Sequence, residues 1–462
     1  MHHRRAALCC GAVSVLEAAR PTAVPAVAFL PWLVAYAVLP AWRGSRFFLL
    51  ASVVTLAVVE GPWIALGLVA AVVLGYALVE GVFRLPAGWR RWAFAVVLLA
   101  MHAAYWASFH LPVPEVFRQA PLRDADQAPA FVLFSGIGAT FFRMVSYAWD
   151  RWRGVCGQTG LREYLTYMLF FPQFRHGPLE RCSDFAAQVR SAPGAWSLRD
   201  AAVGLGRVAA ALVTLGLLGV VGSAGGQYVP EVFGRPGLAA LSQPERLSVG
   251  ELLLLMHAPL VLLYLLESSY ARLQLGVSRA FGVRGTENFR YPLLARSPRE
   301  VWHRWNITVS TWLRDYVYIP LGGNRRHKYL NIVLVFVYCG LLHALQWRCV
   351  AWGLWTGGTL ALFVWLTDRW HAYMTRTRSA RPGAVARVRA WGACEDGACP
   401  HGVRRIALAA LRLLGGVVAR VLTFHWLSIG VTIILDPQYC GAKVLARYLQ
   451  WLSGGWITLP LG

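Results

Sequence analysis

The sequence carries little charge for its length. Of the 462 residues, 15% are charged and 57% are hydrophobic, whereas about a quarter of the residues in soluble globular proteins are charged. Lysine is nearly absent: it occurs at Lys328 and Lys443, so 43 of the 45 cations are arginines. This composition excludes a disordered chain and a collagen-like fibre. It also argues against a soluble nucleic-acid-binding protein, despite the net charge of +23, because too little of the chain is polar enough to face water.

Cysteine does not form a recognisable pattern. The nine cysteines are scattered along the chain, which excludes a small scaffold held together by disulfides. Cys394, Cys399 and His401 lie close in sequence, but a fourth ligand and the usual two-residue spacing of a zinc site are missing. We therefore predict no metal site.

What the sequence does have is a series of long apolar segments. A helix needs about 20 mostly apolar residues to cross a bilayer. The segments that meet or approach this length are Val24–Pro40, Phe47–Glu60, Trp63–Phe83, Trp92–His110, Phe131–Trp149, Ala201–Gly222, Gly250–Leu266, Tyr329–Trp347, Val350–Thr367, Ile406–Leu435 and, more weakly, Val444–Leu461. They predict an all-α polytopic membrane protein with about ten to twelve transmembrane helices.

The arginines predict how these helices are oriented. They concentrate in the connections at 84–91, 150–163, 175–199, 272–328 and 369–405, all of which fall on one side of the membrane if the segments alternate. Loops rich in Lys and Arg remain in the cytoplasm, so we assign this side as cytoplasmic. Residues from about 370 to 405 are predicted to form a cytoplasmic loop. We see no internal repeat or domain break, so residues 1–462 are predicted to form a single membrane domain.

One segment is apolar but too short to span. The apolar run 164–174 is interrupted at Pro172, and Arg175, His176 and Pro178 follow it. A short, broken apolar segment with polar residues at its tip is typical of a re-entrant element, which needs protein or a water-filled cavity around it. An amphipathic helix lying at the membrane interface is the alternative.

A second unusual segment, 297–324, combines aromatic, cationic and amide side chains. Ser297 and Glu300 match a capping box, and Pro298 suits the first helical turn. Helical spacing places aromatic and apolar residues on one face: Val301, Trp305, Trp312 and Tyr316. Polar residues lie on the adjacent face: Asn306, Ser310 and Arg314. We predict a helix that lines a groove and ends at the turn 322–324.

His343 is the most suggestive single residue. It lies within 329–347, an otherwise almost wholly apolar segment. Ionisable residues inside membrane helices are costly and usually face a bundle interior or cavity, and a neutral imidazole there can act as a general base. A histidine that only bonds a neighbouring helix is the alternative. We favour that structural role for His102, His257 and His425, which also lie in apolar runs.

Four stretches resemble one protein family, the membrane-bound O-acyltransferases, and in particular its bacterial branch that modifies alginate and teichoic acid. They are FLPWLVAYAVLP at 29–40, the FPQ and GP element within 161–189, VWHRWNITVSTWLRDYVYIPLGGNR at 301–325, and CGLLHALQWRCVAWGLWTGG at 339–358. The core motifs thus lie in 161–189 and 297–358. The resemblance implies a multi-helix fold with a central funnel and re-entrant segments.

The resemblance also implies an activity, the transfer of an acyl group from a cytoplasmic thioester to a hydroxyl. His343 matches the catalytic histidine of the family. Asn306 matches a second polar position that is usually His in the bacterial members, and Leu342 stands where they usually have Trp. An amide is no base, but it can donate a hydrogen bond to a carbonyl oxygen.

The remaining expectations concern ligands. Acetyl-CoA or an acyl carrier protein would supply the acyl group, and no bound cofactor or metal is expected. The candidate donor- or substrate-binding residues are Arg304, Trp305, Arg314, Asp315, Arg325 and His176, although each arginine could instead anchor the chain at lipid headgroups. The expected location is the bacterial inner membrane, in contact with its lipids. A separate extracytoplasmic acetyl-transfer protein is a possible partner, and nucleic acid is not.

The sequence leaves alternatives open for the acceptor molecule and for the class of reaction. A cell-surface polysaccharide is the expected acceptor, with a lipid or a protein as the alternatives. Asp124 and Asp126 would suit the metal site of a polytopic glycosyltransferase. Arginine-lined re-entrant segments and a membrane histidine would also suit a transporter or flippase.

Overall fold

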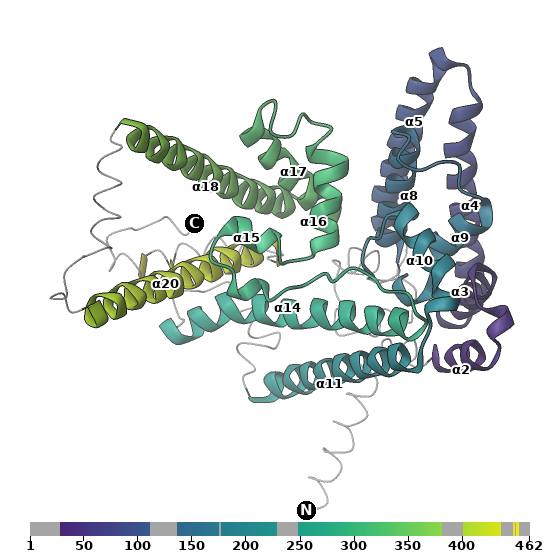
Figure 1. Cartoon of the computed structure of the whole chain (residues 1–462), viewed down its shortest axis with the longest axis horizontal. Coiled ribbons are helices and arrows are strands. Elements are labelled where there is room, and N and C mark those ends of the chain that lie inside the picture. The colour runs from purple at the N-terminus through teal and green to yellow at the C-terminus, as the bar shows by residue number, and fades with distance from the viewer. Residues whose placement is uncertain are drawn as a thin grey trace, which may run out of the picture.

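The described residues of the chain are helical. The computed structural model describes residues 28–110, 136–174, 177–228, 248–380, 401–435, 447–448 and 450–451, and it contains no strand among them. Helices α2 to α10 stand together on one side of the molecule (Figure 1). Helices α11 and α14 extend away from this group, side by side, toward a second group formed by α15 to α20.

The first group contains both long and short helices. Its elements are α2 (Leu30–Val38), η1 (Pro40–Trp42), α3 (Ser45–Val59), α4 (Pro62–Arg84), α5 (Ala87–Ala107), η2 (Ser108–His110), α8 (Ile137–Trp152), α9 (Leu161–Leu169), η3 (Phe171–Gln173) and α10 (Cys182–Ala195). Helix α4 begins with a proline directly after Gly61, whose φ is 94°. Proline suits a first helical position, where no partner is needed for its missing N–H.

The two connecting helices are α11 (Leu198–Tyr228) and α14 (Val249–Ala280). The 3₁₀ turn η5 (Pro292–Leu294) follows them. The second group consists of α15 (Pro298–Trp302), α16 (Ile307–Leu313), the π-helical turn η6 (Arg314–Tyr318), α17 (Lys328–His343), α18 (Trp347–Ala380) and α20 (His401–Leu435). The turn predicted at 322–324 is present, with positive φ at Gly322 and Gly323.

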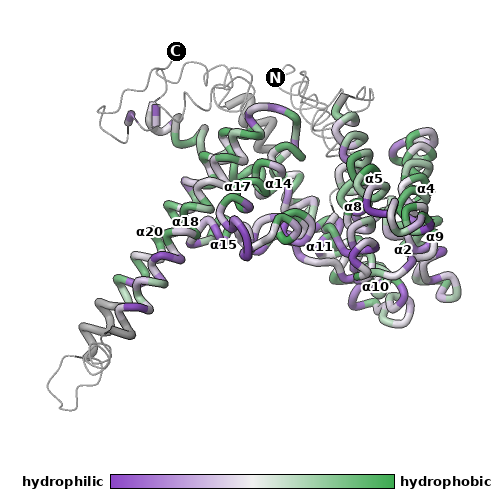
Figure 2. Tube along the Cα trace, turned by 90° about the horizontal axis from the view of Figure 1, so that it is seen from above, coloured by the Kyte–Doolittle hydropathy of each residue, from purple (hydrophilic) through white to green (hydrophobic). Residues whose placement is uncertain are grey.

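Four described helices are long and apolar enough to cross a membrane: α4, α11 over Leu198–Gly219, α18 over Trp347–Thr377 and α20 over Ala409–Ile434. Helices α3 and α17 are apolar but shorter. Figure 2 shows hydrophobic residues running along α4, α17 and α18, while hydrophilic ones gather around α15. The all-α membrane class is thereby confirmed, and the total of ten to twelve spans stays a prediction.

Several predicted boundaries are wrong. Within the described residues the first predicted span, 24–40, is helical over α2 and ends at Val38, because Pro40 opens a 3₁₀ turn; residues 24–27 lie outside them. The span predicted to end at Leu266 continues as α14 to Ala280. The predicted loop at 370–405 begins and ends in helix, since α18 reaches Ala380 and α20 starts at His401. Good helix formers such as Arg, Ala and Met allow polar ends to extend an apolar helix. Most of 444–461 lies outside the described residues.

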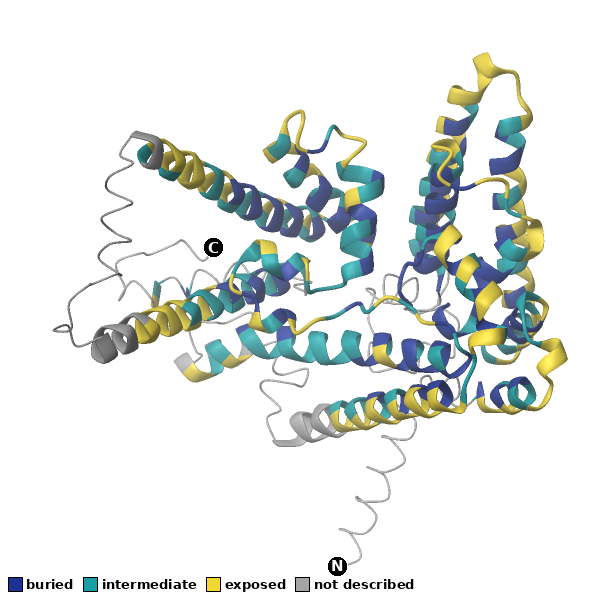
Figure 3. Ribbon diagram, in the orientation of Figure 1, coloured by how far each residue is buried: buried dark blue, intermediate teal, exposed yellow. Residues whose placement is uncertain are grey.

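Glycines bring two helix pairs into close contact. In α17 and α18, a Cβ added to Gly340 would overlap the carbonyl oxygen of Cys349, and one added to Gly353 would lie 2.5 Å from Val337 Cα. In α11 and α14, a Cβ on Gly204 would lie 2.5 Å from Gly276 O. Small residues at such contacts let membrane helices pack backbone to backbone. Figure 3 shows the buried residues following these contacts, whereas the outer ends of α11, α18 and α20 are exposed.

The short apolar segment is broken as predicted. Helix α9 ends at Leu169, and η3 contains Pro172. Most of α9 is buried, so the segment packs inside the protein rather than on its surface. The guanidinium of Arg143, only 2% exposed, donates to the carbonyl oxygens of Tyr167 (3.3 Å), Met168 (3.2 Å) and Gln173 (2.8 Å). It satisfies carbonyls that the interrupted helix leaves without partners. The depth of this segment in the membrane stays a prediction.

Replacing Arg143 with methionine should therefore destabilise the fold. Methionine fills similar space but leaves three buried carbonyls without a donor, at an expected cost on the order of 3 kcal/mol. The melting temperature of the detergent-purified protein is the measurement. Arg190→Met is the matched control, because Arg190 forms an exposed ion pair with Glu163 and such pairs contribute little. Equal melting temperatures for the two variants would contradict this role of Arg143.

Candidate active site

A cavity of about 780 Å³ connects the two groups of helices. Residues from α5, α8, α14, α15, α16, α17, α18 and α20 line it. His343, Asn306, Trp305 and Arg314 are among them. The structure thus brings together four of the residues that the sequence singles out, including the two predicted to be catalytic.

His343 is the last residue of α17, and its ring opens onto the cavity. Its Nδ1 lies 2.8 Å from the carbonyl oxygen of Cys339. A carbonyl only accepts hydrogen bonds, so Nδ1 carries the proton and Nε2 has a free lone pair. The ring also packs edge-on against Trp352, with centroids 5.7 Å apart. This arrangement fixes the tautomer that a general base requires.

Two side chains of α5 hold the end of α17. Tyr105 Oη donates to the carbonyl oxygen of Leu342 at 2.6 Å, and Trp106 Nε1 donates to that of Leu341 at 3.2 Å. The last carbonyls of a helix have no partner within it, so these bonds complete the helix end that carries His343. Sequence analysis missed both residues, because they lie more than 230 positions away along the chain.

The helix predicted within 297–324, ending at the turn 322–324, is not continuous. Helix α15 ends at Trp302, α16 begins at Ile307, and Asn306 between them has φ 43° and ψ 55°. Asparagine tolerates this left-handed conformation better than most residues. Its side chain makes no capping bond to α16, and the residue lines the cavity. The predicted capping box is half formed: Ser297 Oγ accepts from Glu300 N at 3.2 Å, while Glu300 Oε2 accepts from the backbone of Arg296 (2.7 Å) instead of Ser297.

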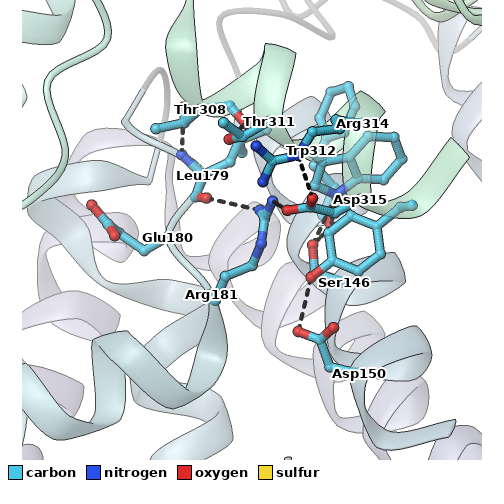
Figure 4. A network of polar contacts seen from close by, with 12 residues as sticks. Ser146, Asp150, Leu179, Glu180, Arg181, Thr308, Thr311, Trp312, Arg314 and Asp315 are labelled. Carbon is cyan, nitrogen blue, oxygen red and sulfur yellow. Dashed lines mark hydrogen bonds and ion pairs between the residues drawn. The ribbon is translucent and has the colours of Figure 1, made fainter. Parts of the chain in front are cut away.

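The backbone after Asn306 is fixed by Asn288, which is 4% exposed. The carbonyl oxygen of Asn288 accepts from Ile307 N at 2.9 Å, and its Oδ1 accepts from Thr308 N at 3.1 Å and from Thr308 Oγ1 at 2.6 Å. Thr308 Oγ1 in turn accepts from Leu179 N at 3.0 Å (Figure 4). Thr308 therefore joins the two motif segments, 161–189 and 297–358, in space.

Thr308→Val should weaken this junction. Valine matches the shape of threonine but leaves Leu179 N without its acceptor, so we expect a loss of about 2 kcal/mol in unfolding free energy. Thr308→Ser keeps the hydroxyl and should lose less than half as much. Thermal unfolding in detergent compares the two. If serine is as damaging as valine, the methyl group and not the hydrogen bonds holds the junction.

A chain of polar contacts connects Arg314 to helix α8. Arg314 Nε donates to Asp315 Oδ1 at 2.8 Å, and Arg181 donates to Asp315 Oδ2 at 2.9 Å (Figure 4). The Arg181 guanidinium lies 4.7 Å from the ring centroid of Tyr316, whose hydroxyl donates to Asp150 at 2.8 Å. Asp315 does not line the cavity, whereas Arg314 does; the bond between them holds Arg314 at the cavity edge.

The other predicted binding residues lie elsewhere. Arg304 does not line the cavity and pairs with Glu300 at 2.5 Å. The backbone N–H of Arg296, followed by the charge of Arg304, keeps the pKa of Glu300 below its usual value, so this pair stays ionised at neutral pH. Arg325 is exposed and also lies off the cavity. His176 lies outside the described residues.

Sequence analysis missed the cations that do line the cavity beside Arg314. These are Arg299, Lys328 and Arg348. Lys328 pairs with Asp368 at 2.5 Å. Arg299 and Lys328 stand in basic stretches that also contain exposed arginines, and Arg348 is the single cation of an apolar segment, so only their position in the fold identifies them.

The structure describes some of the residues on which the alternative interpretations depend. His102 bonds the carbonyl oxygen of Leu98 and the hydroxyl of Tyr338, and His257 bonds Ser428 Oγ, as a structural role requires. Within the described ranges, no group of three His, Cys, Asp or Glu could hold a metal ion. Asp124, Asp126, Cys394 and Cys399 lie outside those ranges.

Comparison with known proteins decides the family. The model of the membrane-bound O-acyltransferase family matches residues 72–395. This protein belongs to the membrane-bound O-acyltransferase family. The resemblance seen in the sequence motifs is thereby confirmed, and both His343 and Asn306 fall within the matched region.

Curated relatives of the family show partial similarity. The chain is 32% identical over 238 residues to "Probable alginate O-acetylase AlgI" of Azotobacter vinelandii, covering 49% of the chain and 44% of the relative. It is 28% identical over 252 residues to "Teichoic acid D-alanyltransferase" of Streptococcus thermophilus, covering 51% and 58%. It is 30% identical over 204 residues to "Peptidoglycan O-acetyltransferase" of Helicobacter pylori, covering 43% and 37%. The matches span about half the length of these relatives.

Proposed function

We propose that this protein is a multi-pass O-acyltransferase of the bacterial inner membrane. It would move an acyl group, most simply acetyl, from a cytoplasmic thioester to a hydroxyl of a cell-surface polysaccharide. The observation that carries the proposal is the free Nε2 of His343 in a cavity shared with Asn306, within a chain of this family. The relatives named for alginate and peptidoglycan O-acetylation support the choice of acceptor.

The cavity suits a long thioester donor. Lys328 and His343, the first and last residues of α17, both line it, and 15 helical residues span about 22 Å. Arg299 and Arg314 line the cavity together with Lys328. Cations bind phosphate oxygens by charge-assisted hydrogen bonds. We assign this cationic end to the phosphate of coenzyme A or of a carrier protein's phosphopantetheine arm, with the thioester reaching His343.

The chemistry then needs only this chain's residues and the two substrates. His343 Nε2 accepts the proton of the acceptor hydroxyl, whose oxygen attacks the thioester carbonyl. The side-chain amide of Asn306 donates to the developing oxyanion. The C–S bond breaks, the leaving thiolate takes the proton back from the imidazolium, and the products are an ester and a free thiol. No metal or bound cofactor takes part in these steps.

The test is transfer of label by the purified full chain in lipid nanodiscs. With acetyl-CoA or an acetylated carrier protein labelled in the acetyl group, we expect alkali-labile label on a polysaccharide acceptor. Absence of label on polysaccharide, lipid and protein acceptors with either donor would contradict the proposal. Movement of substrate across the membrane without a covalent product would favour a transporter.

We also propose membrane lipids and an extracytoplasmic transfer protein as partners. The test reaction is therefore run with and without the extracytoplasmic fraction of the source cells. Label that reaches lipid or protein instead of polysaccharide would identify one of the alternative acceptors. Nucleic acid has no part in the proposal.

A further inference from the structure

The cavity contains one acidic side chain among its described lining residues, that of Glu267. It lies on α14, one residue past the end of the span predicted from the sequence. Within the described part of the chain, Glu267 makes no ion pair or hydrogen bond. Leu263 and Ala271, one turn away on either side, also line the cavity, so this face of α14 forms a continuous wall.

An unpaired carboxylate in such a wall is costly. Burying a charge without a partner is unfavourable, and ionisable residues inside membrane proteins usually mark ligand pathways. Of the four described cations that line the cavity, Arg314 pairs with Asp315 and Lys328 pairs with Asp368. The other two, Arg299 and Arg348, form no ion pair with Glu267 in the described part of the chain. Glu267 is therefore available to a ligand.

A cluster of three aromatic rings begins one helical turn before Glu267. Tyr264, one turn before it on α14, lies 6.0 Å from Trp305 and 5.9 Å from Phe289, and Phe289 and Trp305 are 5.5 Å apart, all between ring centroids. Phe289 and Trp305 line the cavity. These two rings and Glu267 therefore line the same cavity as the second predicted catalytic residue, Asn306, which Trp305 immediately precedes.

We propose that Glu267, Phe289 and Trp305 form the acceptor subsite, which takes a neutral sugar. This inference rests on the proposed function. The rings offer an apolar platform to the C–H face of a sugar ring. Burial raises the pKa of Glu267 to about 7, so above that pH its carboxylate is mostly ionised and accepts hydrogen bonds from hydroxyl groups. The same carboxylate repels an acceptor that carries carboxylates of its own. The subsite therefore selects an uncharged glycan over a polyuronate such as alginate.

The first test measures binding without turnover. Cellotetraose and tetramannuronate serve as the neutral and anionic probes, titrated calorimetrically against the full chain in nanodiscs at about pH 8.5, where the Glu267 carboxylate is mostly ionised. We expect the wild type to bind cellotetraose at least tenfold more tightly, a difference of about 1.4 kcal/mol. Glu267→Gln should remove most of this preference, and Phe289→Leu should lower the affinity for both probes. A wild-type preference for tetramannuronate, or an unchanged ratio in Glu267→Gln, would overturn the proposal.

The second test separates acceptor from donor binding during acetyl transfer. Glu267→Gln should raise the KM for cellotetraose about tenfold and leave the KM for acetyl-CoA unchanged. Glu163→Gln, an acid in an exposed ion pair outside the cavity, is the matched control and should change neither. A rise confined to the donor KM would overturn the acceptor assignment. The proposal would also be overturned if Glu267→Gln lost transfer activity only with aminoacyl thioesters. That result would assign Glu267 to binding the ammonium group of the donor.

Failure of the proposed function is distinguishable from failure of this inference. If the wild type transfers no acetyl group, the reaction class is wrong. If it transfers acetyl groups with the same acceptor preference as Glu267→Gln, the reaction class holds and the acceptor subsite is wrong.

Discussion

Replacing His343 with alanine is expected to reduce acyl transfer by about a thousandfold, the range that loss of a general base produces. The acceptor hydroxyl would then have no group to take its proton at the moment of attack. Stability should change little, because the ring contacts Trp352 only edge-on and its hydrogen bond is to the carbonyl of its own helix, Cys339 O. Initial rates with labelled donor and melting temperatures measure the two effects.

His425 provides the matched control for this experiment. Its Nδ1 lies 3.2 Å from the carbonyl oxygen of Val421, the same bond within its own helix that His343 makes. It does not line the cavity. His425→Ala should therefore retain near wild-type rates. If both alanine variants lose transfer equally, histidine packing and not proton transfer at His343 explains the loss. His343→Gln, which keeps a polar side chain but no base, should be as inactive as His343→Ala.

Gly340→Ala should have the second large effect, on folding and activity together. The added methyl group would overlap the carbonyl oxygen of Cys349, and backbone atoms move aside less easily than side chains. Overpacking of this kind costs typically about 1–3 kcal/mol. Because Gly340 stands one turn before His343, separation of α17 from α18 would also shift the base. Yield of folded protein, melting temperature and initial rate should all fall.

Gly358 is the control for this substitution. It lies on α18, and a Cβ added there would meet no atom within 4 Å. Alanine also favours helix over glycine by about 1 kcal/mol, so Gly358→Ala should be as stable as the wild type or more so. Equal damage from the two substitutions would show that glycine flexibility, rather than close packing at Gly340, is what the hairpin of α17 and α18 requires.

The sequence predicts best what depends on composition and on local motifs. Apolar length alone placed α4 and α20 within a few residues of their observed ends. The motif resemblance placed His343 and Asn306, which the structure brings to one cavity. Both kinds of signal are local. They need no knowledge of which helices are neighbours.

What the sequence could not predict depends on tertiary contacts. The break at Asn306 carries no glycine or proline, and the aromatic spacing around it fits a continuous helix; the partner that holds the break, Asn288, is 18 residues away. The sequence also could not predict which arginines line the cavity, for the same reason. Arg304 and Arg299 stand in one basic stretch, yet Arg299 faces the cavity while Arg304 pairs with Glu300 outside it.

The position of His343 at the end of α17 has a consequence for the reaction itself. The carbonyl end of a helix carries a partial negative charge, which favours a nearby cation by about 0.3–1 kcal/mol and up to about 2 kcal/mol where the site is partly buried. Helix α17 stops at His343 because Ala344 is extended, with φ −167°. When the imidazole takes a proton, its new charge therefore forms beside the negative pole of its own helix. The fold supplies the counter-charge for the imidazolium without a carboxylate partner.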